Sequence, residues 1–250
     1  MKVGTDGVLL GAWTQPVIPA QAGIPINILD IGTGSGLIAL MLAQKTVGGI
    51  PACAGMTTPL PHVEIDAIDI DENAYKQTVI NFKNAPFKTK LNAIHGDFRT
   101  FAPKQKYDLI VSNPPFFVDS LPSPDEGRTT ARHTNALPFS DLIQHSAELL
   151  NNNGRLVLIL PFDAFDTIQS LAEKNGLTLT RKTAVKPKEN TAPNRMLLEY
   201  RLCTGDPCGR PANRPTNRPT ENELTIRQAN GTFSDEYMAL TKDFYLNFPE

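Results

Sequence analysis

The sequence predicts an α/β fold in which an open, mostly parallel β-sheet carries helices on both faces. Three features of the chain lead to this prediction. Apolar runs of strand length alternate with segments of helical periodicity over most of the 250 residues. A glycine-rich turn, GTGSG at residues 32–36, joins the first apolar run to the first helical segment. Acidic side chains follow the ends of successive runs, and doubly wound sheets bind ligands at the carboxyl ends of their strands.

In the first half of the chain, predicted strands and helices take turns. An apolar run at residues 26–31 leads through the glycine-rich turn into a helical segment at 37–44. A second strand is predicted at 64–70, and amphipathic spacing predicts a helix at 72–83. A weaker strand follows at 91–95.

The second half continues the alternation and ends in two strands. Its first predicted elements are the strand 107–112, the helix 139–150, the strand 155–160 and the helix 164–174. Asn153-Gly154 would cap the first helix and Asn175-Gly176 would end the second, because Gly and Asn adopt the conformation that terminates helices. The alternating runs 177–185 and 196–202 suit an antiparallel pair that closes one edge of the sheet.

Composition limits the class of protein. The chain is 40% hydrophobic and has a net charge of −2, so it can bury a core and has no overall basic field. No apolar run approaches the ~20 residues that span a bilayer, and the N-terminus is too weakly apolar for a signal peptide. We therefore expect a cytoplasmic protein with no membrane partner. Cys53, Cys203 and Cys208 lack the spacing of a zinc site, so we expect free thiols and no metal.

Three segments interrupt the α/β pattern, and we interpret them as inserted loops in a single domain that spans residues 1–250. They cover residues 16–25, 47–61 and 204–220. The first two contain the similar octets IPAQAGIP and IPACAGMT, which are too few copies for a repeat architecture. The third is rich in Pro and Arg, so it is expected to be extended or disordered, although its arginines could also contact phosphate.

Acidic residues at three strand ends form a candidate ligand site. Asp30 stands just before the glycine-rich turn, where a buried carboxylate would need donors such as a ligand ammonium. Asp69 can accept hydrogen bonds from both hydroxyls of a ribose. Asp97 can accept from an exocyclic amine, and Phe98 can wall a purine. Each could alone be an ordinary turn residue, and Asp71 is better explained as a helix N-cap.

The glycine-rich turn has the spacing G-x-G-x-G. It is not the dinucleotide motif, because Leu37 stands where that motif has its third glycine. Glycines allow the main chain to approach a ligand where a Cβ would clash. A turn of this kind is a weak signal by itself and gains weight from the acidic residues beside it.

The fourth predicted strand ends in SNPPFF at residues 112–117, which an ordinary turn does not require. Proline cannot donate to a strand ladder, and adjacent phenylalanines are not turn residues. The loop could be a stiff cover over a hydrophobic cluster. It could instead be a rigid clamp for a flat ring, with the amide of Asn113 directed at that ring.

Together these residues resemble the class I S-adenosylmethionine-dependent methyltransferases. Asn113-Pro114-Pro115-Phe116 matches the [D/N/S]-P-P-[Y/F/W] motif of members that methylate a planar amino group. The resemblance implies a Rossmann-like, seven-stranded sheet of order 3-2-1-4-5-7-6 and S-adenosyl-L-methionine as cofactor. The cofactor-binding residues that it implies are Asp30, Gly32, Thr33, Gly34, Gly36, Asp69, Asp97, Phe98 and Asn113.

The motif implies catalytic roles for Asn113, Pro114 and Phe116. The side-chain carbonyl of Asn113 and the backbone carbonyl of Pro114 can accept both hydrogens of an exocyclic amine. This directs the nitrogen lone pair at the methyl group. Phe116 offers a face on which a base can stack. The implied substrate-binding residues are Pro115, Phe116, Arg128, Arg132 and His133.

Further segments are similar to bacterial tRNA adenine-N6 methyltransferases that act on position 37 of a valine tRNA. They are residues 2–13, 28–44, 131–139, 195–199, 233–237 and 240–245. The similarity implies N6-methylation of a tRNA adenine by a monomer that contacts the anticodon-loop region. Two alternatives stay open. One is methylation of another planar amine, either guanine N2 in rRNA or a protein glutamine amide, and the other is an inactive RNA-binding relative.

Positive charge for an RNA partner has to come from local groups. Besides the arginines after the SNPPFF loop, a second set surrounds the last predicted pair of strands. It consists of Lys182, Lys186, Lys188 and Arg195. Ordinary solvated surface explains any single one of these charges equally well.

Overall fold

The computed structural model describes residues 4–15, 17, 25–48, 62–114, 137–202 and 219–245. Among them one sheet has eight strands in the order β3-β2-β1-β4-β5-β7-β6-β8. The strands are β1 (Ile26–Ile31), β2 (Val63–Asp69), β3 (Lys90–His95), β4 (Tyr107–Ser112), β5 (Leu150–Pro161), β6 (Leu177–Lys186), β7 (Arg195–Leu202) and β8 (Thr220–Thr225). Strand β7 runs antiparallel to β5 and β6, and the other pairs are parallel.

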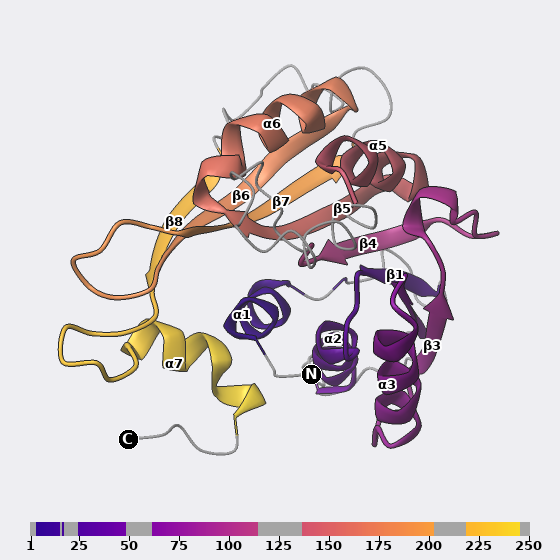
Figure 1. The fold of residues 1–250 in the computed structure, drawn as a ribbon, viewed down its shortest axis with the longest axis horizontal. Helices are drawn as coiled ribbons and strands as arrows, with labels where there is room; N and C mark the ends of the chain where they lie inside the picture. Colours follow the sequence, from indigo (N-terminus) through magenta and orange to yellow (C-terminus); the bar gives the residue numbers. More distant parts are fainter. Residues whose placement is uncertain are drawn as a thin grey trace, which may run out of the picture.

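Helices cover both faces of the sheet, as Figure 1 shows. They are α1 (Thr5–Trp13), α2 (Leu37–Gly48), α3 (Glu72–Lys83), α5 (Phe139–Leu149), α6 (Phe165–Lys174) and α7 (Asp235–Thr241). Short 3₁₀ turns are η1 (Phe98–Thr100), η2 (Phe162–Ala164) and η3 (Lys242–Phe244). Helices α5 and α6 lie on one face, and the other helices lie on the opposite face. None of the helices in the described ranges is long and apolar enough to cross a membrane.

The predicted order of the first seven strands is confirmed, and the predicted total is wrong by one. Strand β8 adds to the open edge of β6, in parallel, at the end of the segment that the sequence marked as an inserted loop. Most of its side chains are exposed, and Leu224 is its one buried residue. The apolar pattern of the sequence therefore could not predict this strand. The insertions predicted at 16–25, 47–61 and 204–220 lie almost entirely outside the described residues.

The predicted cap of the helix before β5 is also wrong. Helix α5 ends at Leu149 and β5 begins at the next residue, so Asn153 and Gly154 lie inside the strand. Asn153 has a φ of 64°, and the register between β4 and β5 shifts near this point. A Cβ on Gly154 would stand 3.0 Å from the carbonyl oxygen of Tyr107. The Asn-Gly pair therefore makes an irregularity in the strand instead of ending the helix.

Helix α1 packs closely on α2 and is tied to the sheet. A Cβ on Gly11 would fall 2.6 Å from the sulfur of Met41, so a larger residue there would displace the Met41 side chain. At the end of α1, the indole of Trp13 donates to the hydroxyl of Thr183 at 3.0 Å. The guanidinium of Arg181 lies 3.5 Å from the centre of the Trp13 ring. These contacts fix α1 between α2 and strand β6.

Candidate functional site

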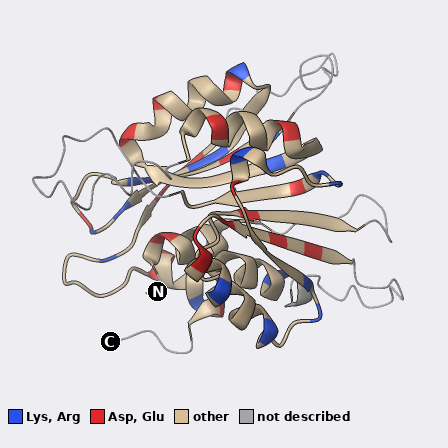
Figure 2. Cartoon of the chain, turned by 45° about the vertical axis from the view of Figure 1, so that its right-hand side comes forward, with Lys and Arg blue, Asp and Glu red and all other residues tan. Residues whose placement is uncertain are grey.

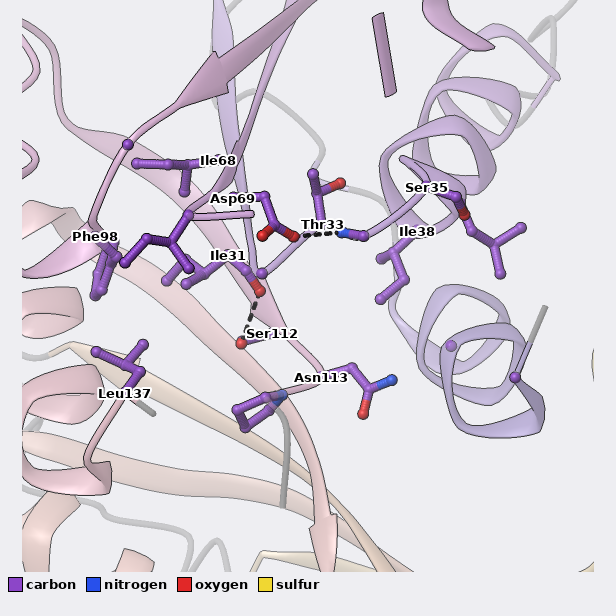
Figure 3. Close-up of a pocket in the computed structure, with 18 of the residues that line it drawn as sticks. Ile31, Thr33, Ser35, Ile38, Ile68, Asp69, Phe98, Ser112, Asn113 and Leu137 are labelled. Carbon is purple, nitrogen blue, oxygen red and sulfur yellow. Dashed lines mark hydrogen bonds between the residues drawn. The ribbon is translucent and has the colours of Figure 1, made fainter. Parts of the chain in front are cut away.

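A cavity of about 410 Å³ opens at the carboxyl ends of β1, β2, β3 and β4. Figure 3 shows side chains from these strand ends converging on it, with Asp69, Phe98 and Asn113 around the opening. The glycine-rich turn after β1 forms one wall, and Gly7 of α1 with the N-cap Gly4 forms another. The ends of four strands and the start of α1 therefore contribute to one site, as expected for the ligand site of an open α/β sheet.

The glycine-rich turn has a backbone that other residues would strain. Gly32, Gly34 and Gly36 have φ angles of 68°, 63° and 78°, which favour glycine. A Cβ on Gly36 would stand 2.8 Å from the ring of Phe82 on α3. At Gly32, by contrast, a Cβ would meet no described atom within 4 Å, although this residue lines the cavity. The glycine there leaves room for a ligand to approach the main chain.

Asp69 joins this turn to the end of β2. Its Oδ2 accepts a hydrogen bond from the amide of Gly34 at 2.8 Å, and its Oδ1 accepts from the amide of Asp71 at 2.9 Å. Its carboxylate is held at the cavity wall with lone pairs to spare for a ligand. The side chain of Asp71 accepts from the amide of Ala74 at 2.8 Å. This confirms the interpretation of Asp71 as the N-cap of α3.

Asp97 and Phe98 stand beside the end of β3 and also line the cavity. The guanidinium of Arg99 binds both carboxylate oxygens of Asp97, and these bonds hold the pKa of Asp97 below its ordinary range. The ring of Phe98 is 5% exposed and packs edge-on against the ring of His145, with centroids 4.9 Å apart. The site thus has an anionic acceptor next to a fixed apolar wall.

Asp30 is placed differently from the other two predicted acids. Its carboxyl is completely buried and is not among the described residues that line the cavity. Oδ2 accepts from the hydroxyl of Thr33 at 2.6 Å and from the amide of Ala39 at 3.2 Å. Oδ1 has no hydrogen-bond partner in the described part of the chain. Burial raises the pKa of Asp30 to about 7. Because it accepts from both Thr33 and Ala39, its carboxyl connects the glycine-rich turn to α2 beneath the cavity.

Asn113 and Pro114 follow β4 and line the cavity opposite the turn. The side chain of Asn113 is half-buried and Pro114 is buried. The hydroxyl of Ser112 donates to the carbonyl of Ile31 at 2.9 Å, which ties the start of this loop to β1. The other residues predicted here lie outside the described residues, and they are Pro115, Phe116, Arg128, Arg132 and His133.

The sequence did not predict several of the residues that line the cavity. Gly4 and Gly7 were noticed only as part of a similar segment, because Gly7 and Gly11 within the nine residues of α1 weaken its helical signal. Ile70 and Leu137 are apolar and carry no motif, although Ile70 lies directly after Asp69 and is 39% exposed at the cavity. Within the described ranges, no three His, Cys, Asp or Glu side chains could together hold a metal ion.

The basic residues around β6 and β7 are mostly paired with acids. Lys182 and Lys186 form ion pairs with Glu221 and Glu223 of β8, at 3.2 Å and 2.6 Å. Arg195 pairs with Asp6 of α1. Figure 2 shows Lys and Arg spread over both helix layers and the sheet, with Asp and Glu among them. This pairing weakens the hypothesis that these groups form a surface for RNA.

Comparison with known proteins agrees with the geometry. Residues 17–174 match the family model of the methyltransferase small domain. A relative from Bacteroides fragilis (strain YCH46), named tRNA1(Val) (adenine(37)-N6)-methyltransferase, is 38% identical over 98% of this chain and 91% of its own length. A relative of the same name from Flavobacterium psychrophilum is 39% identical over 98% of this chain and 93% of its own length.

A solved structure shows the same fold. It is protein Atu636 from Agrobacterium tumefaciens, described as a predicted O-methyltransferase. The two structures superpose with a TM-score of 0.64, over 95% of this chain and 96% of that chain. Because the sequences are only 15% identical, this likeness concerns the fold alone.

Proposed function

This chain belongs to the methyltransferase small domain family, in common with its relatives named tRNA1(Val) (adenine(37)-N6)-methyltransferase, and we propose that it is a methyltransferase of the same specificity. It transfers the methyl group of S-adenosyl-L-methionine to N6 of adenosine 37 in a valine tRNA. One observation carries the proposal. Asp69, Asp97 and Asn113, from the carboxyl ends of β2, β3 and β4, line a single cavity with the glycine-rich turn that follows β1.

The cavity suits the three parts of this cofactor. The space at Gly32 and the amides of the turn suit the methionine part. The carboxylate of Asp69 suits the ribose hydroxyls, since each oxygen accepts only one bond from the main chain. Asp97 and Phe98 suit an adenine, as acceptor for its amine and as wall for its ring. When bound, S-adenosylmethionine supplies an electrophilic methyl group on a sulfonium.

The residues after β4 act on the second reactant. The side-chain oxygen of Asn113 and the carbonyl of Pro114 accept the two hydrogens of the target amine and thereby orient its lone pair. The tie from Ser112 to Ile31 holds these acceptors in place before the base arrives. The amine loses a proton only after it has acquired the methyl group, so the step needs orientation and no strong base.

The proposed tRNA contacts come from residues that follow this loop. Phe116 stacks on the target base, Pro115 keeps the loop open, and Arg128, Arg132 and His133 bind phosphate groups near the anticodon loop. The protein acts as a monomer in the cytoplasm, where tRNA is modified. Only local charge serves the RNA, because the net charge of the chain is −2.

Methyl transfer from tritiated S-adenosylmethionine tests the proposal. The substrate is an unmodified tRNA1(Val) transcript, and the matched control is the same transcript with guanosine at position 37. We expect label in the first transcript alone, recovered as N6-methyladenosine after digestion. Label recovered as a methylated guanosine, or equal label in both transcripts, would contradict the assignment of the base. Binding of S-adenosylhomocysteine without any transfer would instead favour an inactive RNA-binding relative.

A further inference from the structure

Arg99 forms several hydrogen bonds with the carboxylate of Asp97, which lines the cavity. The backbone amide of Arg99 donates to Oδ1 at 2.9 Å. Its Nε lies 3.0 Å from Oδ1 and 2.9 Å from Oδ2, and its Nη2 lies 2.5 Å from Oδ2. Three nitrogens of one residue therefore bind one carboxylate. The fork geometry is stronger and more directional than a single contact between charges.

The local backbone makes these hydrogen bonds possible. Asp97 is the N-cap of η1, and the tight turn returns Arg99 to the carboxylate that begins it. Phe98, between them in sequence, is buried and lines the cavity. The ring of Phe98 is held from behind by His145, whose Nε2 lies 2.8 Å from the carbonyl oxygen of Phe101. The acceptor and the apolar wall at this end of the cavity thus belong to one rigid turn.

The hydrogen bonds from Arg99 also determine the orientation and the charge of the Asp97 carboxylate. The side chains of Asp97 and Arg99 are 27% and 39% exposed, so without the bonds from Arg99 the carboxylate could rotate into water. Arg99 is the main cause of the lowered pKa of Asp97. Other charged or titratable groups near the pair include Asp69, which lines the same cavity, Asp141, whose charge acts on Arg99, and His145, whose ring packs against Phe98. Three N–H groups of Arg99 use about three of the four lone-pair sites of the carboxylate, which leaves about one site for a donor from the cavity side.

We propose that Arg99 is a positioning residue, which fixes the orientation and charge of Asp97 so that it accepts a hydrogen bond from the exocyclic amine of the bound adenine. The inference rests on the proposed function for the identity of the ligand. It adds a residue outside the sequence motifs, and it makes recognition of the adenine amine depend on a guanidinium that need not touch the ligand.

The test compares two ligands in calorimetric titrations at several pH values. One ligand is S-adenosylhomocysteine, and the other is its analogue with an unsubstituted purine, which lacks the 6-amino group. In the Arg99→Gln variant we expect the Kd for S-adenosylhomocysteine to rise about fivefold at neutral pH. The Kd for the deamino analogue should not change. The loss of affinity on acidification should also begin at a higher pH in the variant, because Asp97 then takes up a proton more readily.

A matched control uses an ion pair at the opposite end of β3, the strand that precedes Asp97. Lys90 pairs with Glu64 at 3.0 Å, and neither residue lines the cavity. The Lys90→Gln variant should bind both ligands as the unchanged protein does, with the same pH dependence. Arg99→Lys should restore only part of the affinity, since an ammonium cannot bind both oxygens in a fork.

Three results would overturn the inference. Equal losses for both ligands would mean that Arg99 supports the cavity in general. Tighter binding of S-adenosylhomocysteine by Arg99→Gln would mean that the guanidinium competes with the ligand for Asp97. An unchanged pH dependence would mean that Arg99 does not control the charge of Asp97. Failure of the unchanged protein to bind S-adenosylhomocysteine is a different outcome, which contradicts the proposed function itself.

Discussion

Arg195 of β7 donates from Nε to Oδ2 of Asp6 in α1 at 2.9 Å, across a separation of 189 positions in the sequence. Asp6 lies in the first turn of α1, where a negative charge also favours the helix dipole. Gly4 and Gly7, on either side of Asp6, line the cavity. The ion pair therefore connects the antiparallel end of the sheet to a wall of the candidate cofactor site.

Breaking this pair should loosen that wall. In Arg195→Gln we expect a severalfold rise in the Kd for S-adenosylhomocysteine. The side chains of Asp6 and Arg195 are 26% and 28% exposed, so the stability lost is up to about 1 kcal/mol. The midpoint of thermal unfolding should therefore fall by about 2–4 °C. Calorimetric titration and thermal unfolding measure the two effects.

The control for this variant is an ion pair on the same sheet that lies away from α1. Lys186→Gln breaks the pair between β6 and β8. We expect a small change in the unfolding midpoint and no change in the Kd. If both variants weaken binding equally, the effect comes from general loosening of the sheet and not from the position of α1.

Asp69 should carry most of the ribose recognition. Asp69→Ala removes both acceptor oxygens, and charge-assisted hydrogen bonds of this kind contribute about 1.5–3 kcal/mol each. The affinity for S-adenosylhomocysteine should drop at least about tenfold. Asp69→Asn keeps one acceptor oxygen and should lose less.

Asp71→Ala is the matched control for the ribose acceptor. It removes the N-cap of α3, which costs about 1 kcal/mol of stability, but it should leave the affinity unchanged. If Asp71→Ala weakens binding more than Asp69→Ala in titrations of the folded proteins, then the two residues have been assigned in the wrong order.

The strands themselves and the positions of Asp69 and Asp97 could be predicted from the sequence because both follow from simple chemistry, whereas the order of the first seven strands was implied by the family resemblance. The strands β1 and β4 are buried almost throughout, so they appear as uninterrupted apolar runs. Asp69 and Asp97 follow such runs directly, and parallel strands bring their carboxyl ends together. The role of Asp30 was less predictable, because sequence position alone does not separate a carboxylate in the cavity from one beneath it.

The features that could not be predicted depend on contacts rather than on patterns. Strand β8 is polar and nearly all exposed, so its apolar content does not distinguish it from a loop. The left-handed Asn153 belongs to a strand only because β4 shifts its register there. The bond between Arg99 and Asp97 requires η1, and two residues of this spacing would not meet on a regular helix.

The buried carboxyl of Asp30 predicts a pH dependence of stability. In the folded chain its pKa is raised to about 7 by burial, whereas the unfolded chain ionises near the ordinary value of 3.8. The folded state binds the additional proton between these values, so this group lowers stability progressively as the pH rises from about 4 to 7. The side chain in Asp30→Asn cannot ionise. Between pH 5 and pH 8 its midpoint of thermal unfolding should therefore rise by several degrees relative to that of the unchanged protein.

Thermal unfolding without ligand at both pH values measures this effect. The relevant quantity is how the difference in midpoint between the variant and the unchanged protein changes from pH 5 to pH 8. Any constant offset from the new amide cancels in that change. A difference that stays the same at pH 5 and pH 8 would show that the carboxyl of Asp30 does not change its protonation on folding.

The segment between β7 and β8 should tolerate shortening but not complete removal. Strand β7 ends at Leu202 opposite Leu177, and β8 begins at Thr220 opposite Arg181. Two strand spacings and four residues along β6 separate these ends, which makes about 16 Å. About five extended residues are needed to cross it.

Replacing residues 203–219 with a Gly/Ser linker of about eight residues should therefore leave the unfolding midpoint within a few degrees. Direct fusion of Leu202 to Thr220 should detach β8 from the sheet and expose Leu224, which is 7% exposed in the structure. Circular dichroism during heating compares the two proteins. A large loss of stability in the linker protein would show that the replaced residues pack against the domain.

Asn113→Ala should separate catalysis from cofactor binding. Asn113 stands across the cavity from Asp69 and supplies one of the two proposed acceptors for the target amine. Loss of a preorganised polar contact of this kind lowers the rate by about 10²–10³. The Kd for S-adenosylhomocysteine should change far less, because the other contacts proposed for the cofactor come from different strand ends. Single-turnover methylation of unmodified valine tRNA, with parallel titrations, gives both quantities.

Asn113→Ser is the informative companion to the alanine variant, because it restores an oxygen acceptor at the same position with a shorter reach. Its rate should lie between those of Asn113→Ala and the unchanged protein. If the alanine variant methylates tRNA at nearly the original rate, the amine is not oriented by Asn113. The loop after β4 is then a stiff cover over the cavity, and the ties between Ser112 and Ile31 serve stability alone. Equal rates for serine and alanine, both far below the original, would instead assign the function to the amide nitrogen and not to its oxygen.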